Sequence, residues 1–166
     1  MRSFYKTIPS PVGKLTLVCA EKELAAILWE NEPPDRAGAE EPEPADQNPI
    51  LLEAAGQLAE YFAGRRRRFT LPIPETLRGT PFQRRVWSAL RQIPYGQTLS
   101  YGELARRIGS PAASRAVGGA CGKNPLPILI PCHRVIGQSG KLTGFGGGLD
   151  TKRRLLELEE SVLAKG

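Results

Sequence analysis

The chain carries the stretch ILIPCHRVI at residues 128–136, in which Cys132 stands beside His133, the only histidine among 166 residues. We interpret the apolar run at residues 128–130 as a buried strand that presents the thiol at its end. A free thiol is only a few per cent thiolate at neutral pH, so a reactive cysteine needs a base or a positive neighbour. The stretch therefore predicts a nucleophile, and a cysteine that only fills the core is the alternative.

Charge is divided unevenly along the chain. Residues 1–64 hold 5 Lys and Arg against 11 Asp and Glu, a net charge of −6. Residues 65–166 hold 18 against 6, a net charge of +12. This division indicates that the second part meets a polyanion, and a chance clustering of solvated charges is the other interpretation.

The cysteines and the apolar runs exclude several classes of protein. Cys19, Cys121 and Cys132 are odd in number and form no C-x-x-C pair, so we expect free thiols in a reducing cytoplasm. One histidine and three scattered cysteines predict no zinc site. The N-terminus lacks a signal-peptide core, and no run approaches the ~18 apolar residues of a membrane span, so we expect no membrane contact.

The first part of the chain predicts a small antiparallel sheet with one helix. Strands are expected over residues 3–8, 14–20 and 24–29, with a turn at residues 9–13. Residues 31–49 hold five prolines and six acidic residues and are expected to form a mobile loop. Asn48 is expected to cap a helix that Gly64 ends. The four arginines at 65–68 either complement the dipole of that helix or contact phosphate.

The second part predicts mostly helices. Thr80 is expected to start one helix, and Ser100, with Glu103 three residues later, is expected to cap another. A break at residues 109–111 and a helix over residues 112–120 complete a helix-turn-helix pattern. A last helix is expected from Asp150 to about residue 165.

Two segments of this part leave alternatives open. The helix at 112–120 has small side chains apart from Arg115, which suit either close approach to the minor groove of DNA, with Arg115 as a wedge, or tight packing inside the protein. The glycine-rich residues 143–148 are either a backbone surface for a flat ligand or a long hairpin turn.

The stretch GKNPLPILIPCHRVIG at residues 122–137 resembles the signature of the O6-alkylguanine-DNA alkyltransferases. Similarity extends back to Tyr101 and to ASRAVGG at 113–119, and forward through GFGG at 144–147 to Lys152 and LLELE at 155–159. It is dense over about residues 80–160 and weak over residues 1–75. We expect an α+β chain with a small sheet-and-helix domain at residues 1–77 and a winged-helix-like catalytic domain with the helix-turn-helix at residues 78–166.

The resemblance implies catalytic roles for five residues. Cys132 would accept the alkyl group, His133 would draw off its proton through a water, and Glu159 would orient and charge-stabilise His133. Asn124 would hold the turn that joins the DNA-binding helix to the active-site strand. Tyr101 would help to rotate the nucleotide and would donate a proton to the departing guanine.

The resemblance also implies binding residues and a partner. Arg115 would fill the gap left in the duplex by the extruded base, beside the small residues of its helix, which are Ala113, Ser114, Ala116 and Gly118. The guanine pocket would be lined by Pro127, Val135, Phe145 and Gly146. No metal and no organic cofactor is implied. The expected partner of the monomer is double-stranded DNA that carries O6-alkylguanine, whose lesion is reached by flipping the base out of the stack.

Transfer to a thiol gives a thioether that water does not cleave, so the resemblance implies that each molecule acts once. Two other functions are weighed against this one. A non-catalytic sensor of alkylated DNA, or a regulator, would use the same helix-turn-helix without transferring anything. A cysteine hydrolase is disfavoured, because its Cys and His are ordinarily far apart in sequence and because it leaves the +12 half unexplained.

Overall fold

Three segments near the N-terminus form the strands β1 (Ser3–Ile8), β2 (Leu15–Ala20) and β3 (Glu23–Leu28) in the computed structural model of the chain. The structure describes residues 2–32, 41–138, 140, 142 and 145–165. It divides into two units, Met1–Glu75 and Thr76–Gly166.

The sheet of the first unit has the order β3-β2-β1-β4. β1 and β2 pair antiparallel from Ser3↔Ala20 to Ile8↔Leu15, and β2 pairs antiparallel with β3. A two-residue strand, β4 (Glu43–Pro44), pairs parallel with β1. The expectation of a loop over all of residues 31–49 is therefore wrong at β4, where backbone pairing with an edge strand outweighs the unfavourable composition; residues 33–40 lie outside the described part.

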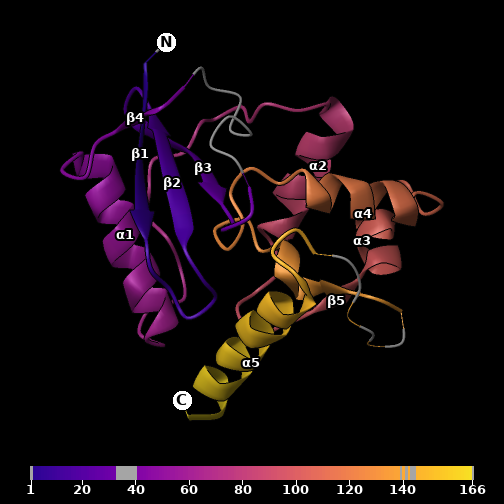
Figure 1. Cartoon of the computed structure of the whole chain (residues 1–166). Helices are drawn as coiled ribbons and strands as arrows, with labels where there is room; N and C mark the ends of the chain where they lie inside the picture. The colour runs from indigo at the N-terminus through magenta and orange to yellow at the C-terminus, as the bar shows by residue number, and fades with distance from the viewer. Residues whose placement is uncertain (1, 33–40, 139, 141, 143–144, 166) are drawn as a thin grey trace. The chain divides into compact units, whose positions relative to one another are not determined.

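Helix α1 (Pro49–Phe62) lies along one face of this sheet (Figure 1). Its start follows the sequence signal, because the Asn48 side chain accepts hydrogen bonds from the backbone N–H groups of Ile50 and Leu51 at 2.9 and 3.2 Å. Gly64 ends the helix with φ +77°, a left-handed conformation that favours glycine. The buried face of α1 carries Leu51, Ala54, Gln57, Leu58 and Tyr61.

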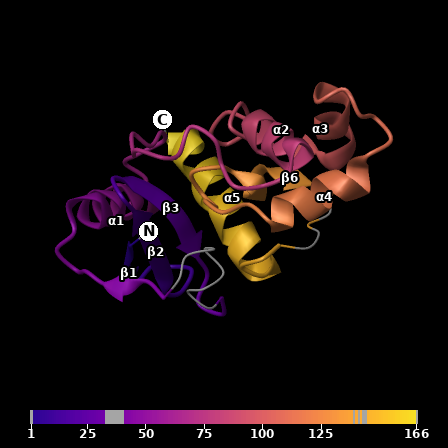
Figure 2. The same cartoon turned by 90° about the horizontal axis from the view of Figure 1, so that it is seen from above.

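The second unit is mostly helical. Its elements are α2 (Pro81–Leu90), β5 (Leu99–Ser100), α3 (Tyr101–Arg107), α4 (Ser114–Gly122), the 3-10 helix η2 (Cys132–Arg134), β6 (Val135–Ile136) and α5 (Leu149–Lys165). Helices α2, α3 and α4 pack together (Figure 2). The buried Trp87 of α2 donates its indole N–H to the Ala120 carbonyl of α4 at 2.9 Å. Among the described helices, none is long and apolar enough to cross a membrane.

The α+β fold class agrees with the expectation from sequence, and so do the helix starts of this unit. Thr80 and Ser100 each form a capping box, with Gln83 and Glu103 respectively. The second helix of the helix-turn-helix begins at Ser114, two residues later than expected, because Ala113 N–H donates to the Ser110 carbonyl in a preceding turn.

The run at residues 128–130 is not a strand, so that expectation is wrong. Ile128 has φ +76°, and residues 127–130 form a turn closed by an isolated bridge between Pro127 and Ile130. An apolar run of this length is buried either way, and its periodicity does not separate a strand from a buried turn. Cys132 therefore begins a short 3-10 helix rather than ending a strand.

Candidate active site

The candidate site is centred on η2, which carries Cys132, His133 and Arg134 in consecutive positions. All three side chains are buried; Cys132 is 5% exposed and His133 is 0% exposed. A thiol covered to this degree can react only with a group that enters the protein. The reacting partner must therefore be small, or must be held out from a larger molecule.

Asn124 holds the turn that precedes the thiol. Its amide nitrogen donates to the Ile130 carbonyl at 2.7 Å, and its amide oxygen accepts from the Leu126 N–H at 2.9 Å. Both bonds are buried, so they compensate backbone groups that water does not reach. The left-handed Ile128 lies inside the loop that Asn124 spans. One side chain thus fixes the backbone that leads from α4 to Cys132.

Glu159 of α5 lies at the centre of a buried hydrogen-bond network. Its Oε2 is 2.6 Å from His133 Nε2 and accepts from Arg134 Nη2 at 3.0 Å. Its Oε1 accepts from Arg134 Nε at 2.8 Å and from the Gly96 N–H at 3.0 Å. Gly96 has φ +78°, and a Cβ there would overlap the side chain of Leu163. The loop after α2 therefore approaches α5 closely enough to complete the network.

The network sets the protonation states of the site. Burial raises the pKa of Glu159, but the hydrogen bond and charge of His133 and those of Arg134 outweigh burial and hold this pKa far below 4.5. Burial lowers the pKa of His133 below 6.5, against the opposing effect of Glu159. Glu159 is therefore ionised and His133 neutral at neutral pH. Because a carboxylate accepts the Nε2–H, the proton-accepting lone pair of the ring is on Nδ1.

The thiol and this ring nitrogen are suited to proton transfer. Burial raises the pKa of Cys132 to about 11, although a hydrogen bond from Asn124 and the charge of Lys152 act in the opposite direction. Cys132 is therefore a neutral thiol before reaction. His133 Nδ1 is buried and has no hydrogen-bond partner in the described part of the chain. The site thus contains an acid that needs a base and a base with a free lone pair.

Tyr101 lies beside a buried lysine of α5. Lys152 is 0% exposed, and its Nζ is 3.4 Å from the Tyr101 hydroxyl and 5.6 Å from the centre of the Tyr101 ring. The same ammonium is 5.9 Å from the centre of the Phe145 ring. A hydrogen bond from an ammonium to a phenol oxygen stabilises the phenolate and so makes the phenol a better proton donor. Tyr101, Lys152 and Phe145 therefore form a second cluster of the site.

Short parallel strands bring this cluster to η2. Leu99 of β5 pairs with Val135 of β6, and Ser100 pairs with Ile136. Tyr101 follows β5 directly, and η2, which begins with Cys132, directly precedes β6. The segments that carry the tyrosine and the cysteine are therefore both joined to this small sheet. Gly118 of α4 lies against the same tyrosine, because a Cβ on it would meet the Tyr101 ring at 3.8 Å.

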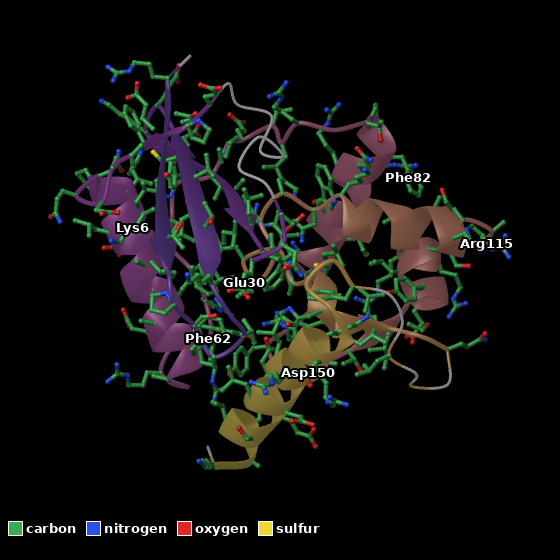
Figure 3. All side chains as sticks on the ribbon, in the orientation of Figure 1. Lys6, Glu30, Phe62, Phe82, Arg115 and Asp150 are labelled. Carbon is green, nitrogen blue, oxygen red and sulfur yellow. The ribbon has the colours of Figure 1, made fainter. Side chains whose placement is uncertain are left out.

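Helix α4 presents small residues to solvent. Ser114, Arg115 and Ala116 are exposed, Ala113 and Gly118 are half-buried, and the buried face holds Val117 and Ala120. Figure 3 shows Arg115 at the N-terminal end of α4. This exposure favours the surface interpretation of the helix over tight packing inside the protein.

The residues predicted to line the pocket lie in different surroundings. Pro127 and Val135 are buried, Phe145 is half-buried next to Lys152, and Gly146 is exposed. Thr143 and Gly144 of the glycine-rich loop lie outside the described residues. Within the described residues, no group of three His, Cys, Asp or Glu side chains is arranged to hold a metal ion.

Sequence reasoning gave no role to Arg134 or Lys152. A signal for Lys152 was available: positions 152, 155 and 159 share one face of the predicted helix, so Lys152 and Glu159 occupy positions of the apolar stripe. The structure shows Lys152, Leu155 and Glu159 buried. Charged residues at core positions need partners, and these are the groups described above.

Comparison with known proteins shows which family has this arrangement. Residues 81–161 match the model of the 6-O-methylguanine DNA methyltransferase DNA-binding domain, and residues 3–74 match that of the ribonuclease-like domain of the same proteins. The chain is 51% identical to the methylated-DNA–protein-cysteine methyltransferase of Mycolicibacterium paratuberculosis, over 93% of this chain and 91% of that protein. The chain belongs to this methyltransferase family.

Other methyltransferases of the family extend the match. The constitutive methylated-DNA–protein-cysteine methyltransferase of Bacillus subtilis is 42% identical, over 95% of each chain. The crystal structure of Mycobacterium tuberculosis OGT in complex with DNA superposes with a TM-score of 0.87 at 48% identity, covering 96% of this chain and 94% of that one. These full-length relatives are methyltransferases, so a non-catalytic sensor is not favoured for this member of the family.

Proposed function

We propose that Cys132 takes the alkyl group from O6-alkylguanine in duplex DNA and keeps it as a thioether. The activity itself follows from the family: the chain repairs DNA by transferring an alkyl group from DNA to one of its own cysteines. The observation that carries the assignment to Cys132 is its position next to His133, whose Nε2 is bound by Glu159 at 2.6 Å while its Nδ1 has no partner in the described part of the chain.

The first step is removal of the thiol proton. The pKa of Cys132 is about 11, so the thiol ionises only when a base takes its proton. His133 takes this proton at Nδ1, through a water, and Glu159 stabilises the imidazolium that forms. The charge of Lys152 also lowers the pKa of the Cys132 thiol, so it stabilises the thiolate.

The second step is an in-line displacement at the alkyl carbon. The Cys132 sulfur forms a bond to that carbon, the bond from the carbon to O6 breaks, and its electron pair goes to guanine. Tyr101 gives its hydroxyl proton to the departing guanine, which is a poor leaving group as an anion. Lys152, 3.4 Å from the Tyr101 hydroxyl, stabilises the phenolate left behind. Placement matters more here than stabilisation of an oxyanion.

DNA binding must bring the lesion to a thiol that is 5% exposed. The exposed small residues of α4 enter the minor groove, and Arg115 fills the gap from which the alkylated base is flipped. Pro127, Val135, Phe145 and Gly146 contact the flipped guanine. Asn124 holds the turn before Cys132 in place through its hydrogen bonds to residues 126 and 130.

The proposed chemistry bears on turnover, oligomeric state and location. Water does not cleave a thioether, so each molecule reacts once and the transfer is irreversible. One chain holds every residue of the proposed chemistry, so the protein acts as a monomer. The cytoplasm is the compartment we propose, because a thiol that repairs DNA needs reducing surroundings that contain DNA, and the three free cysteines support this proposal.

Measuring methyl transfer from a labelled O6-methylguanine duplex to purified protein tests this function. Wild type and the control variant Cys121→Ala are expected to take up one methyl group per chain and then stop. Cys132→Ala is expected to take up none and still to bind the duplex. Uptake by Cys132→Ala, or none by folded, DNA-binding wild type, would contradict the proposal, and the second result would favour the sensor.

A further inference from the structure

Arg134 is a buried arginine, and all three nitrogens of its guanidinium donate hydrogen bonds. Nε and Nη2 donate to the two oxygens of Glu159 at 2.8 and 3.0 Å, and Nη1 donates to the Ile93 carbonyl at 2.8 Å. Its side chain is 8% exposed. The guanidinium carbon is 5.5 Å from the centre of the Tyr95 ring. The alkyl-transfer chemistry described above uses none of these contacts.

We propose that Arg134 is a positioning residue for alkyl transfer, which acts through Glu159 to keep His133 a neutral base with Nδ1 directed away from the carboxylate. The inference rests on the proposed role of His133 as the base for Cys132. It adds a fourth member to the thiol, imidazole and carboxylate series, and this member carries a permanent positive charge.

The geometry of Glu159 supports this role. A carboxylate has about four sites for hydrogen-bond donors. The Arg134 fork occupies two of these sites, Gly96 occupies a third and His133 Nε2 a fourth. The carboxylate cannot rotate toward His133 without breaking the fork. A bidentate pair of this kind also holds the acceptor in one plane, so the ring of His133 receives a fixed partner on one side only.

The charges around His133 also support a positioning role for Arg134. Glu159 and Lys152 act on the imidazole from α5, and Arg134 acts from η2 itself; the adjacent Cys132 is a neutral thiol before reaction. Tyr95 faces the arginine from the loop after α2. A carboxylate 2.6 Å from an imidazole would by itself favour imidazolium. An imidazolium has no free lone pair, so it cannot accept the thiol proton. Burial acts most strongly against that effect by lowering the pKa of His133, and the positive charge of Arg134 lowers the pKa further.

The test uses the fact that His133 is the only histidine in the chain. Its titration can therefore be followed by NMR as a single imidazole signal, without any transfer assay. In Arg134→Gln the His133–Glu159 pair is expected to take up a proton at a pH higher by about one unit or more. The pH below which the methyl-transfer rate falls, the acid limb of its pH profile, should rise by the same amount. On the acid side of the pH profile, transfer should then fall by up to about tenfold, whereas transfer at pH 8.5 should change little.

Two further variants separate charge from structure. Arg134→Lys keeps the charge but cannot form the fork, so we expect slower transfer with the acid limb where wild type has it. Arg91→Gln makes the same change at an exposed arginine of α2's C-terminus and should leave both the titration and the rate as in wild type. If Arg134→Gln does not fold, the Lys variant alone decides, since a shifted acid limb or an unchanged rate in it overturns the inference.

The remaining results are equally decisive. An unchanged histidine titration in folded Arg134→Gln overturns the inference, and so does a rate reduced by the same factor at every pH. If wild type transfers no methyl group, the proposed function is contradicted. A shifted His133 titration in Arg134→Gln would still show that Arg134 acts on His133.

Discussion

At the scale of single residues, the nucleophile and its base are both neutral before reaction. The sulfur and the imidazole next to it are neutral, whereas Glu159 and Arg134 form a buried ion pair behind them. Sequence placed Cys132 and His133 together because they are adjacent. It placed Glu159 only by resemblance, because no spacing rule relates positions 26 residues apart. The partners of Arg134 come from the loop after α2 and from α5, and neither is visible in the local sequence.

The pH dependence of stability follows from these residues. In the folded chain the pKa of His133 lies below 6.5, so below pH 6.5 the unfolded chain binds more protons and the free energy of unfolding falls. Glu159 contributes stability above about pH 4.5 that is lost as the pH falls through its depressed pKa. Urea unfolding at pH 7.5, 6.5 and 5.5 should show a loss of up to about 1.4 kcal/mol per pH unit. His133→Gln should flatten this slope between pH 6.5 and 5.5, and an equal slope in both proteins would contradict the assignment.

Asn124 is expected to matter for both stability and transfer. Asn124→Ala leaves the Leu126 N–H and the Ile130 carbonyl buried without a partner, at a cost of about 2–4 kcal/mol in the free energy of unfolding. The turn before Cys132 then loosens, so methyl transfer should slow as well. Asn48→Ala, the matched control at the N-cap of α1, should cost about 1 kcal/mol and leave transfer unchanged. Equal losses of stability in the two variants would show that the turn does not depend on Asn124.

At the scale of elements, local signals predicted the helix starts, while tertiary contacts decided the rest. Asn48, Thr80 and Ser100 cap their helices because each bond is formed within four residues of the cap. The apolar run at residues 128–130 does not form the expected strand, because Asn124, outside the run, holds it as a turn. This turn includes a positive φ at Ile128, which an isoleucine rarely adopts. β4 was missed because its pairing partner is β1, about forty residues earlier in the chain.

The capping box of α3 positions Tyr101 at the first turn of the helix. Ser100→Ala removes the bond from the Glu103 N–H to the serine hydroxyl and should cost about 1 kcal/mol in the free energy of unfolding. The same change at the exposed Ser88 in α2 should be neutral or slightly stabilising, because alanine is the better helix former. Thermal unfolding of both variants measures this. A Ser100→Ala protein as stable as Ser88→Ala would argue against the cap.

Helix α4 gives a prediction about base flipping. Arg115→Ala should slow methyl transfer from duplex DNA about tenfold to a hundredfold, because nothing then compensates the few kcal/mol lost on unstacking the base. Transfer from free O6-methylguanine needs no flipping and should be unaffected. Single-turnover rates on both substrates measure the two effects. A variant slowed equally on both would show that Arg115 does not act on the duplex.

At the scale of the whole molecule, charge follows function rather than fold. The excess of +12 lies in residues 65–166, the part that holds the helix-turn-helix and Cys132. The fold class and the helical second part could be predicted from periodicity and capping alone. The arrangement of the site could not, because it joins α3, η2, α5 and the loop after α2, and only the resemblance indicated which of these segments meet.

This charge distribution predicts salt-dependent binding. Affinity for an undamaged duplex should fall about tenfold to a thousandfold between 50 and 200 mM salt, because phosphate contacts release counterions. Cys132→Ala should follow the same line, since the thiol takes no part in nonspecific binding. Fluorescence anisotropy at four salt concentrations measures the slope. A flat line would exclude the basic half as the DNA-binding part.

The most direct measurement locates the transferred group by mass spectrometry. Trypsin places the three cysteines on separate peptides, residues 15–22, 116–123 and 124–134. After reaction with an O6-methylguanine duplex, we expect one added methyl group on the peptide 124–134, at Cys132, and none on the other two. An unmodified peptide 124–134 from protein that has repaired its duplex, or a methyl group on Cys121 or Cys19, would contradict the account.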